Sequence, residues 1–196
     1  MRVVTYNIQY SRGRDGVMDL GRIADTIRDA DIIGMQEVER FWQRSGMVDQ
    51  PAELMKLLPR HHAVFGSYFD MDASVVADDG TVSNRRRQFG NMLFSRWPIV
   101  WTRQHPLPKT HYDDEFNMHQ GALEAVIQPE GRPPIRIILL HLAYISMEKG
   151  DGERMAQINH VLDILNRHEA EGAAWSGPAL LGEDDWSEGE TAPANP

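Results

Sequence analysis

The chain has 196 residues, of which 41% are hydrophobic, and its formal net charge is −9 at pH 7. This length fits one domain with a core of its own, and the acidity argues against binding a phosphate polyanion through charge alone. No apolar run is long enough to span a membrane, and Met1 leads straight into a strand pattern with no room for a signal peptide. The absence of cysteine excludes disulfides and thiolate metal sites and fits a cytoplasmic location.

Hydrophobic patterning predicts an α/β chain in which strands outnumber helices. Strands are expected over 2–7, 31–36, 62–68, 89–94, 99–105, 121–127, 134–142 and 178–181, and helices after Asp19, from Gln50-Pro51 and over 151–168. Because hairpins mix with strand–helix–strand units, the pattern favours a mixed-sheet sandwich over a doubly wound sheet. We expect one domain over 1–186 and an unstructured tail over 187–196.

The last helix should bury a stripe of apolar residues on one face. Met155, Ile158, Val161, Leu162 and Leu165 supply this stripe. The pattern therefore predicts a helix packed on a sheet through these five side chains.

Polar side chains recur where predicted strands end. Asn7 follows the first strand, Glu37 the second and His141 a later one, and Gly182 to Asp185 follow the last. Open α/β sheets assemble catalytic groups at such strand ends, because the strand is rigid and the loop mouth is open. Four such positions in one order suggest a metal site.

Each of these residues also has a simpler interpretation. Alone, Asn7 would end a strand, Glu37 would cap a loop and His141 would be a structural histidine. Together, Asn7 and Glu37 offer the oxygen ligands that Mg²⁺ prefers, and an imidazole at His141 could donate to a phosphate oxygen or protonate a leaving group. The carboxylates of Glu183, Asp184 and Asp185 form either a solvated turn or a cation-binding loop.

With these residues in place, the chain resembles the endonuclease/exonuclease/phosphatase family along most of its length. The order and spacing of several short motifs carry the resemblance. They are Thr5-Tyr6-Asn7-Ile8, Met35-Gln36-Glu37-Val38, Phe89 to Ile99 (FGNMLFSRWPI), Gly121-Ala122-Leu123, Leu140-His141-Leu142, and Arg154 with Gln157.

The resemblance implies a four-layer α/β sandwich with two mixed β-sheets and a site at the top between them. It implies that Asn7 and Glu37 bind Mg²⁺ (or Mn²⁺) and that His141 contacts the scissile phosphate, with Asn91 nearby. Glu183 and Asp185 occupy the family's G-D-x-N element, where Asp and Asn are expected. The extra methylene of Glu183 displaces a base whose position matters, and Asp185 places a negative charge where an amide is expected.

A second departure is that no Asp-His pair occurs in the chain, although the family closes with an S-D-H element. The resemblance then implies a C-terminally incomplete domain. Two functions follow: a Mg²⁺-dependent phosphoesterase, or an impaired member that acts as a binding or assembly module and self-associates through an exposed sheet edge. The substrate would be a phosphate ester, either nucleic acid, a phospholipid headgroup or a sugar phosphate.

Overall fold

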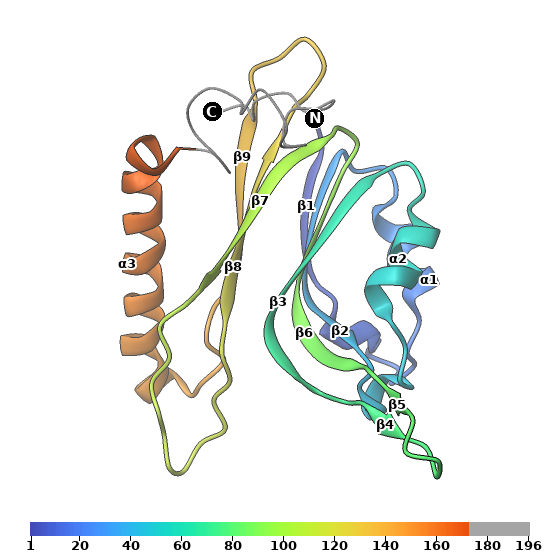
Figure 1. Ribbon diagram of the computed structural model, residues 1–196. Helices are drawn as coiled ribbons and strands as arrows, with labels where there is room; N and C mark the ends of the chain where they lie inside the picture. The colour runs from blue at the N-terminus through green and yellow to red at the C-terminus, as the bar shows by residue number, and fades with distance from the viewer. Residues whose placement is uncertain (173–196) are drawn as a thin grey trace, which may run out of the picture.

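The structure, a computed structural model, describes residues 1–172, apart from the side chains at positions 147, 148, 168 and 169. Two β-sheets pack face to face, and helices cover both outer faces (Figure 1). Helices α1 (Leu20–Ile27) and α2 (Gln50–Leu57) lie on the first sheet, and α3 (Met147–Glu171) lies on the second. The expected four-layer α/β sandwich is confirmed.

The first sheet is mixed. Its strands, in spatial order, are β1 (Val3–Asn7), β2 (Ile32–Arg40), β6 (Arg86–Ser95) and β3 (His62–Asp72). β1 and β2 run parallel and are joined through α1, whose first turn is capped by Asp19 accepting a hydrogen bond from the backbone N of Arg22. Because both strands run in the same direction, their pairing ends with Asn7 beside Gln36, where β1 stops and β2 continues to Arg40.

The second sheet consists, among the described residues, of three antiparallel strands. They are β7 (Ile99–Pro106), β8 (Gly121–Ile127) and β9 (Ile135–His141). The last two are consecutive in the chain and form a hairpin. The core between the sheets includes Leu93 from β6 and Leu123 from β8, and Gly34 gives Leu139 room to approach β2. The second sheet thus brings the end of β9 close to the point where the pairing of β1 with β2 ends.

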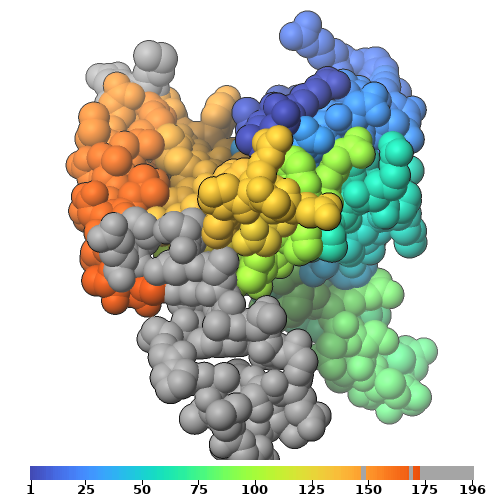
Figure 2. Space-filling view, turned by 90° about the horizontal axis from the view of Figure 1, so that it is seen from above, coloured from blue at the N-terminus to red at the C-terminus, as the bar shows by residue number. Residues whose placement is uncertain are grey.

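A short hairpin extends the β3–β6 pair away from this core. It consists of β4 (Val75–Val76) and β5 (Val82–Ser83), and it projects beyond the body of the molecule in both views (Figures 1 and 2). Seen from above, α3 in orange lies on the opposite side from this hairpin (Figure 2). None of the helices within residues 1–172 is long and apolar enough to cross a membrane.

Candidate functional site

Asn7 and Glu37 meet at the end of the parallel β1–β2 pair. The Nδ2 atom of Asn7 donates a hydrogen bond to Oε1 of Glu37 at 2.8 Å, and Oδ1 of Asn7 accepts one from the backbone N of Gln9 at 3.0 Å. The parallel register that sets Asn7 beside Gln36 places both side chains at one sheet edge. The two residues that strand-end reasoning singled out are therefore in direct contact.

Glu37 occupies an unusual backbone conformation. Its φ angle is +62°, in the left-handed region that residues with a Cβ rarely adopt, and the pairing of β2 with β6 shifts register between Met35 and Val38. Such bulges redirect a side chain out of the regular alternation of a strand and are common beside active sites. Here the bulge coincides with the carboxylate that contacts Asn7.

His141 reaches the same place from the second sheet. It is the last residue of β9, and its Nε2 lies 3.7 Å from Oε1 of Glu37. Burial lowers the pKa of His141, and the nearby Glu37 carboxylate partly opposes that shift. The structure thus brings Asn7, Glu37 and His141 together from three strands in two sheets.

Tyr68, on β3, completes the contacts of His141 and was not anticipated from the sequence. Its hydroxyl lies 2.5 Å from Nδ1 of His141. Burial, reinforced by the Glu37 carboxylate, raises the pKa of Tyr68, so its phenol stays protonated. No sequence motif includes Tyr68. Its role depends on a contact with a strand of the other sheet, and local sequence patterns do not predict such contacts.

Glu37 and His141 line an open cavity of about 360 Å³. Its wall includes Arg44, whose guanidinium lies over the rings of Tyr10 and Trp42, with Cζ 4.1 and 4.7 Å from their centroids. Arg44 also donates to Oε2 of the fully buried Glu39 at 2.7 and 3.0 Å. A rigid cation therefore lies beside the carboxylate and imidazole, a second feature that the motifs did not reveal.

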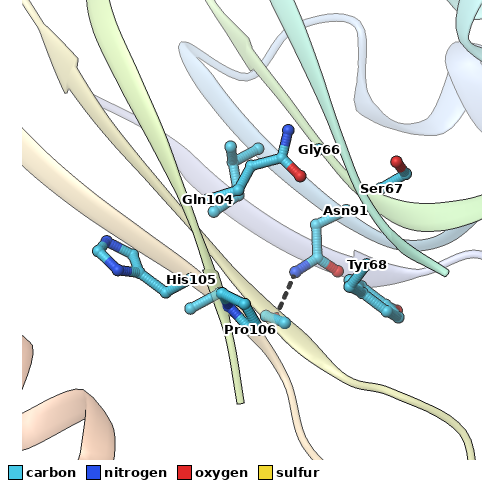
Figure 3. A pocket seen from close by; sticks show the side chains of 10 residues that line it. Gly66, Ser67, Tyr68, Asn91, Gln104, His105 and Pro106 are labelled. Carbon is cyan, nitrogen blue, oxygen red and sulfur yellow. Dashed lines mark hydrogen bonds between the residues drawn. The ribbon is translucent and has the colours of Figure 1, made fainter. Parts of the chain in front are cut away.

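Asn91 lies apart from this cavity. It is fully buried, and its Nδ2 donates to the backbone carbonyls of Gly121 and Leu139, each at 3.1 Å. Figure 3 shows Asn91 next to Tyr68 at a smaller cavity of about 160 Å³ between the sheets. Among the described residues its Oδ1 has no hydrogen-bond partner. Asn91 thus joins β6 to the second sheet near the end of β9.

The remaining predicted site residues are not part of the described structure. Glu183 and Asp185, the strand expected over 178–181 and the tail over 187–196 all lie outside residues 1–172. Their place relative to Glu37 and His141 stays a prediction.

The donor set suits a hard divalent cation better than a softer metal. Within residues 1–172 no three His, Cys, Asp or Glu side chains come together as a metal-binding group. The Glu37 carboxylate is a hard oxygen donor. Asn7 adds an amide oxygen, which in this structure accepts a hydrogen bond from the backbone N of Gln9 while the amide nitrogen faces Glu37. Mg²⁺ is commonly held through one or two carboxylates, with water and substrate phosphate completing its coordination, and the residues present fit this mode.

Comparison with known proteins identifies the family of the chain. The model of the Endonuclease/Exonuclease/phosphatase family matches residues 4–181. The chain belongs to this family. The resemblance inferred from the motifs is confirmed, whereas the comparison with curated proteins finds no significant match.

Two solved structures of family proteins resemble the chain. One, from Beutenbergia cavernae DSM 12333, is 28% identical with a TM-score of 0.66, and the match covers 83% of this chain and 43% of that one. The other, from Leptotrichia buccalis C-1013-b, is 17% identical with a TM-score of 0.55, and the match covers 86% of this chain and 62% of that one. At this identity the likeness supports the fold alone. This chain spans less than two thirds of the length of either protein.

Proposed function

We propose that this chain catalyses the Mg²⁺-dependent hydrolysis of a phosphodiester or phosphomonoester by attack of water. The observation that carries the proposal is that Glu37 contacts both Asn7 and His141, and that Glu37 and His141 line one cavity. Family membership supports hydrolysis of phosphate esters as the reaction class. The alternative of a binding module without catalysis is not favoured by either observation.

In this proposal each residue has a distinct task. Glu37 and Asn7 would hold Mg²⁺ (or Mn²⁺), which when bound supplies charge stabilisation at the phosphoryl oxygens. Nε2 of His141 faces the same space and would donate a hydrogen bond to a phosphate oxygen. Arg44 would add positive charge at the cavity wall, where an acidic protein needs it to admit a phosphate.

Three further residues complete the assignment. We propose that Glu183 takes the place of the acid that orients the attacking water in the family motif, and that Asp185 stands beside it where the motif has an amide. Asn91 is buried and turned toward two backbone carbonyls, so we propose that it supports the site by holding the end of β9 in place. A displacement of a reacting group by about 1 Å can lower the rate about 100-fold. A side chain that keeps the end of β9 in position would therefore contribute to catalysis without contacting the substrate.

The test is turnover of bis(p-nitrophenyl) phosphate and p-nitrophenyl phosphate with Mg²⁺, with Mn²⁺ and with EDTA. Glu37→Gln and His141→Ala should each reduce turnover about 100-fold or more, the scale of a lost group that stabilises transition-state charge. Glu53→Gln is the matched control, because Glu53 is a half-exposed carboxylate on α2 that pairs with Lys56 and does not line the cavity. Turnover that survives EDTA and both site variants would refute the assignment.

The substrate class requires separate assays with the same variants. A single-stranded oligonucleotide, phospholipid vesicles and a sugar phosphate represent the three classes of phosphate ester considered above. A class is accepted only if its hydrolysis is lost on Glu37→Gln, since this loss ties the activity to the described site.

A further inference from the structure

Tyr68 and His141 form a hydrogen bond between the two sheets. Tyr68 lies on β3 of the first sheet and His141 ends β9 of the second, and the phenol oxygen is 2.5 Å from Nδ1. Two aromatic contacts steady the pair, because the Phe89 ring lies 5.9 Å from the Tyr68 ring and 6.2 Å from the His141 ring. The imidazole is therefore held at one nitrogen by a partly buried side chain from the opposite sheet.

Two glycines make room for this arrangement. Gly121 lies directly opposite His141 in the β8–β9 pairing, and a Cβ there would lie 2.7 Å from Cβ of Tyr68 and 2.9 Å from its ring. Gly90 pairs with Ser67, at the point where the pairing of β3 with β6 shifts register and Tyr68 is left unpaired. A Cβ at Gly90 would lie 2.1 Å from the backbone oxygen of Gly66. The contact between Tyr68 and His141 therefore depends on two positions outside the pair itself. Both glycines belong to motifs that carry the family resemblance.

The surroundings of the imidazole select one tautomer. In the described part of the chain the Tyr68 hydroxyl has no hydrogen-bond partner other than Nδ1 of His141. We therefore expect the hydroxyl to donate its proton to Nδ1, so that Nδ1 is the acceptor and carries no hydrogen. On the other side of the ring Nε2 faces the Glu37 carboxylate at 3.7 Å. A carboxylate only accepts, so this contact favours a hydrogen on Nε2. Both neighbours therefore favour the same state of the ring.

We propose that Tyr68 is a positioning residue that holds His141 in the Nε2–H tautomer, so that Nε2 presents its hydrogen to the substrate phosphate. The role in catalysis rests on the proposed function, whereas the tautomer does not. The tautomer and orientation of a functional imidazole are commonly set by the hydrogen bond that its other nitrogen makes. In many proteins Nδ1 carries the hydrogen and donates it to a backbone carbonyl or a carboxylate. Here the phenol of Tyr68 would donate to Nδ1 instead, which leaves the hydrogen on Nε2.

The test reads the tautomer directly. Two-bond ¹H–¹⁵N spectra of the imidazole rings distinguish a protonated from an unprotonated nitrogen, and subtraction of the His141→Asn spectrum assigns His141 among the eight histidines of the chain. In the native protein, under conditions where the ring is neutral, we expect hydrogen on Nε2 only. In Tyr68→Phe, which keeps the ring and removes the hydroxyl, we expect both tautomers.

Two further variants separate positioning from packing. Gly121→Ala should displace the Tyr68 ring and produce the same mixture of tautomers although Tyr68 is retained. Tyr112→Phe should change nothing at His141, because its hydroxyl bonds the backbone oxygen of Lys149 on the exposed surface. Hydrogen on Nδ1 in the native protein, or an unchanged His141 spectrum in Tyr68→Phe, would overturn the proposal.

Activity then tests the link to function. We expect Tyr68→Phe to lower kcat about 10-fold with little change in KM, the usual scale for a lost partner of a functional histidine. An unchanged kcat alongside a changed tautomer would overturn the catalytic role of Tyr68. Absence of turnover in the native chain would count against the proposed function alone, because the tautomer result stands independently of it.

Discussion

Gln157 and Arg154, both on α3, hold the two backbone groups of Ala143, two residues beyond His141. Oε1 of Gln157 accepts from the Ala143 N at 2.8 Å, and Nη1 of Arg154 donates to the Ala143 oxygen at 3.2 Å. Nε2 of Gln157 also donates to the Pro108 oxygen at 3.0 Å. The arginine and glutamine of the last helix thus fix the segment that leaves the candidate site.

Replacing Gln157 with Ala should destabilise the protein by about 2–6 kcal/mol. The side chain is fully buried, and its loss leaves the N–H of Ala143 and the carbonyl of Pro108 without their partner, at roughly 1–3 kcal/mol each. Urea unfolding measures the change. Met155→Ala, on the exposed face of the same helix, should stay within about 0.5 kcal/mol of the native protein. Equal effects of the two changes would contradict this view of α3.

The buried face of α3 shows where sequence reasoning failed. The predicted apolar stripe is wrong in part, because Met155, Leu162 and Leu165 are 61%, 49% and 39% exposed. Val161 is buried as expected, but Gln157 and Glu153 are buried in the same face. Polar side chains can be buried when loops satisfy them, and Glu153 accepts from the Thr110 N and from Asn117. Apolar periodicity contains no information on such loops.

Other features were predictable because they are local. Asp19 was recognised as a helix cap from its position before an apolar repeat. Asn7 and Glu37 were expected to follow apolar strands and do lie in contact, but the expected end of the second strand at Gln36 is wrong, because β2 continues through Glu37 to Arg40. The importance of Tyr68 was not predictable, since it depends on Gly121 lying opposite His141 in another sheet. The left-handed conformation of Glu37 likewise arises from its bulge, not from any glycine-like preference of glutamate.

Mg²⁺ should stabilise the native chain against heat through Glu37. A ligand that binds only the folded state adds about 2.7 kcal/mol at a concentration 100 times its dissociation constant. Differential scanning fluorimetry over a Mg²⁺ titration should show Tm rising with the logarithm of concentration in the native protein and in Glu53→Gln. In Glu37→Gln the rise should disappear. Coincident titrations for Glu37→Gln and the native protein would exclude Glu37 as a ligand.

The ion pairs of Glu124 should make stability depend on pH on the acid side. Burial would raise the pKa of Glu124, but hydrogen bonds from His105 and Arg136, together with their charges, outweigh it and lower the pKa below 4.5. A carboxylate with a lowered folded-state pKa contributes stability above its unfolded pKa and loses it as pH falls through the folded value. We therefore expect unfolding free energy to fall below about pH 4.5 partly through this group.

The matching variant is Glu124→Gln. It should lose about 3 kcal/mol at neutral pH, because Arg136 is left in a largely buried place without its counter-charge. Its stability should also decline less steeply than that of the native protein as pH falls through the acid range. Urea unfolding across pH measures both effects, and Glu53→Gln again serves as the control. Parallel pH profiles for Glu124→Gln and the native protein would contradict the assignment.

Arg44 should serve stability and substrate binding through separable interactions. Arg44→Met leaves Glu39 buried without its cation, which should cost about 3 kcal/mol in unfolding free energy. The double variant Glu39→Gln, Arg44→Met removes both charges and should recover most of that loss, because no uncompensated carboxylate remains. Neither variant restores a cation at the cavity wall beside Glu37. KM for a phosphodiester should therefore rise about tenfold in both, about 1.4 kcal/mol of binding energy. A double variant with native stability and native KM would show that Arg44 only neutralises Glu39.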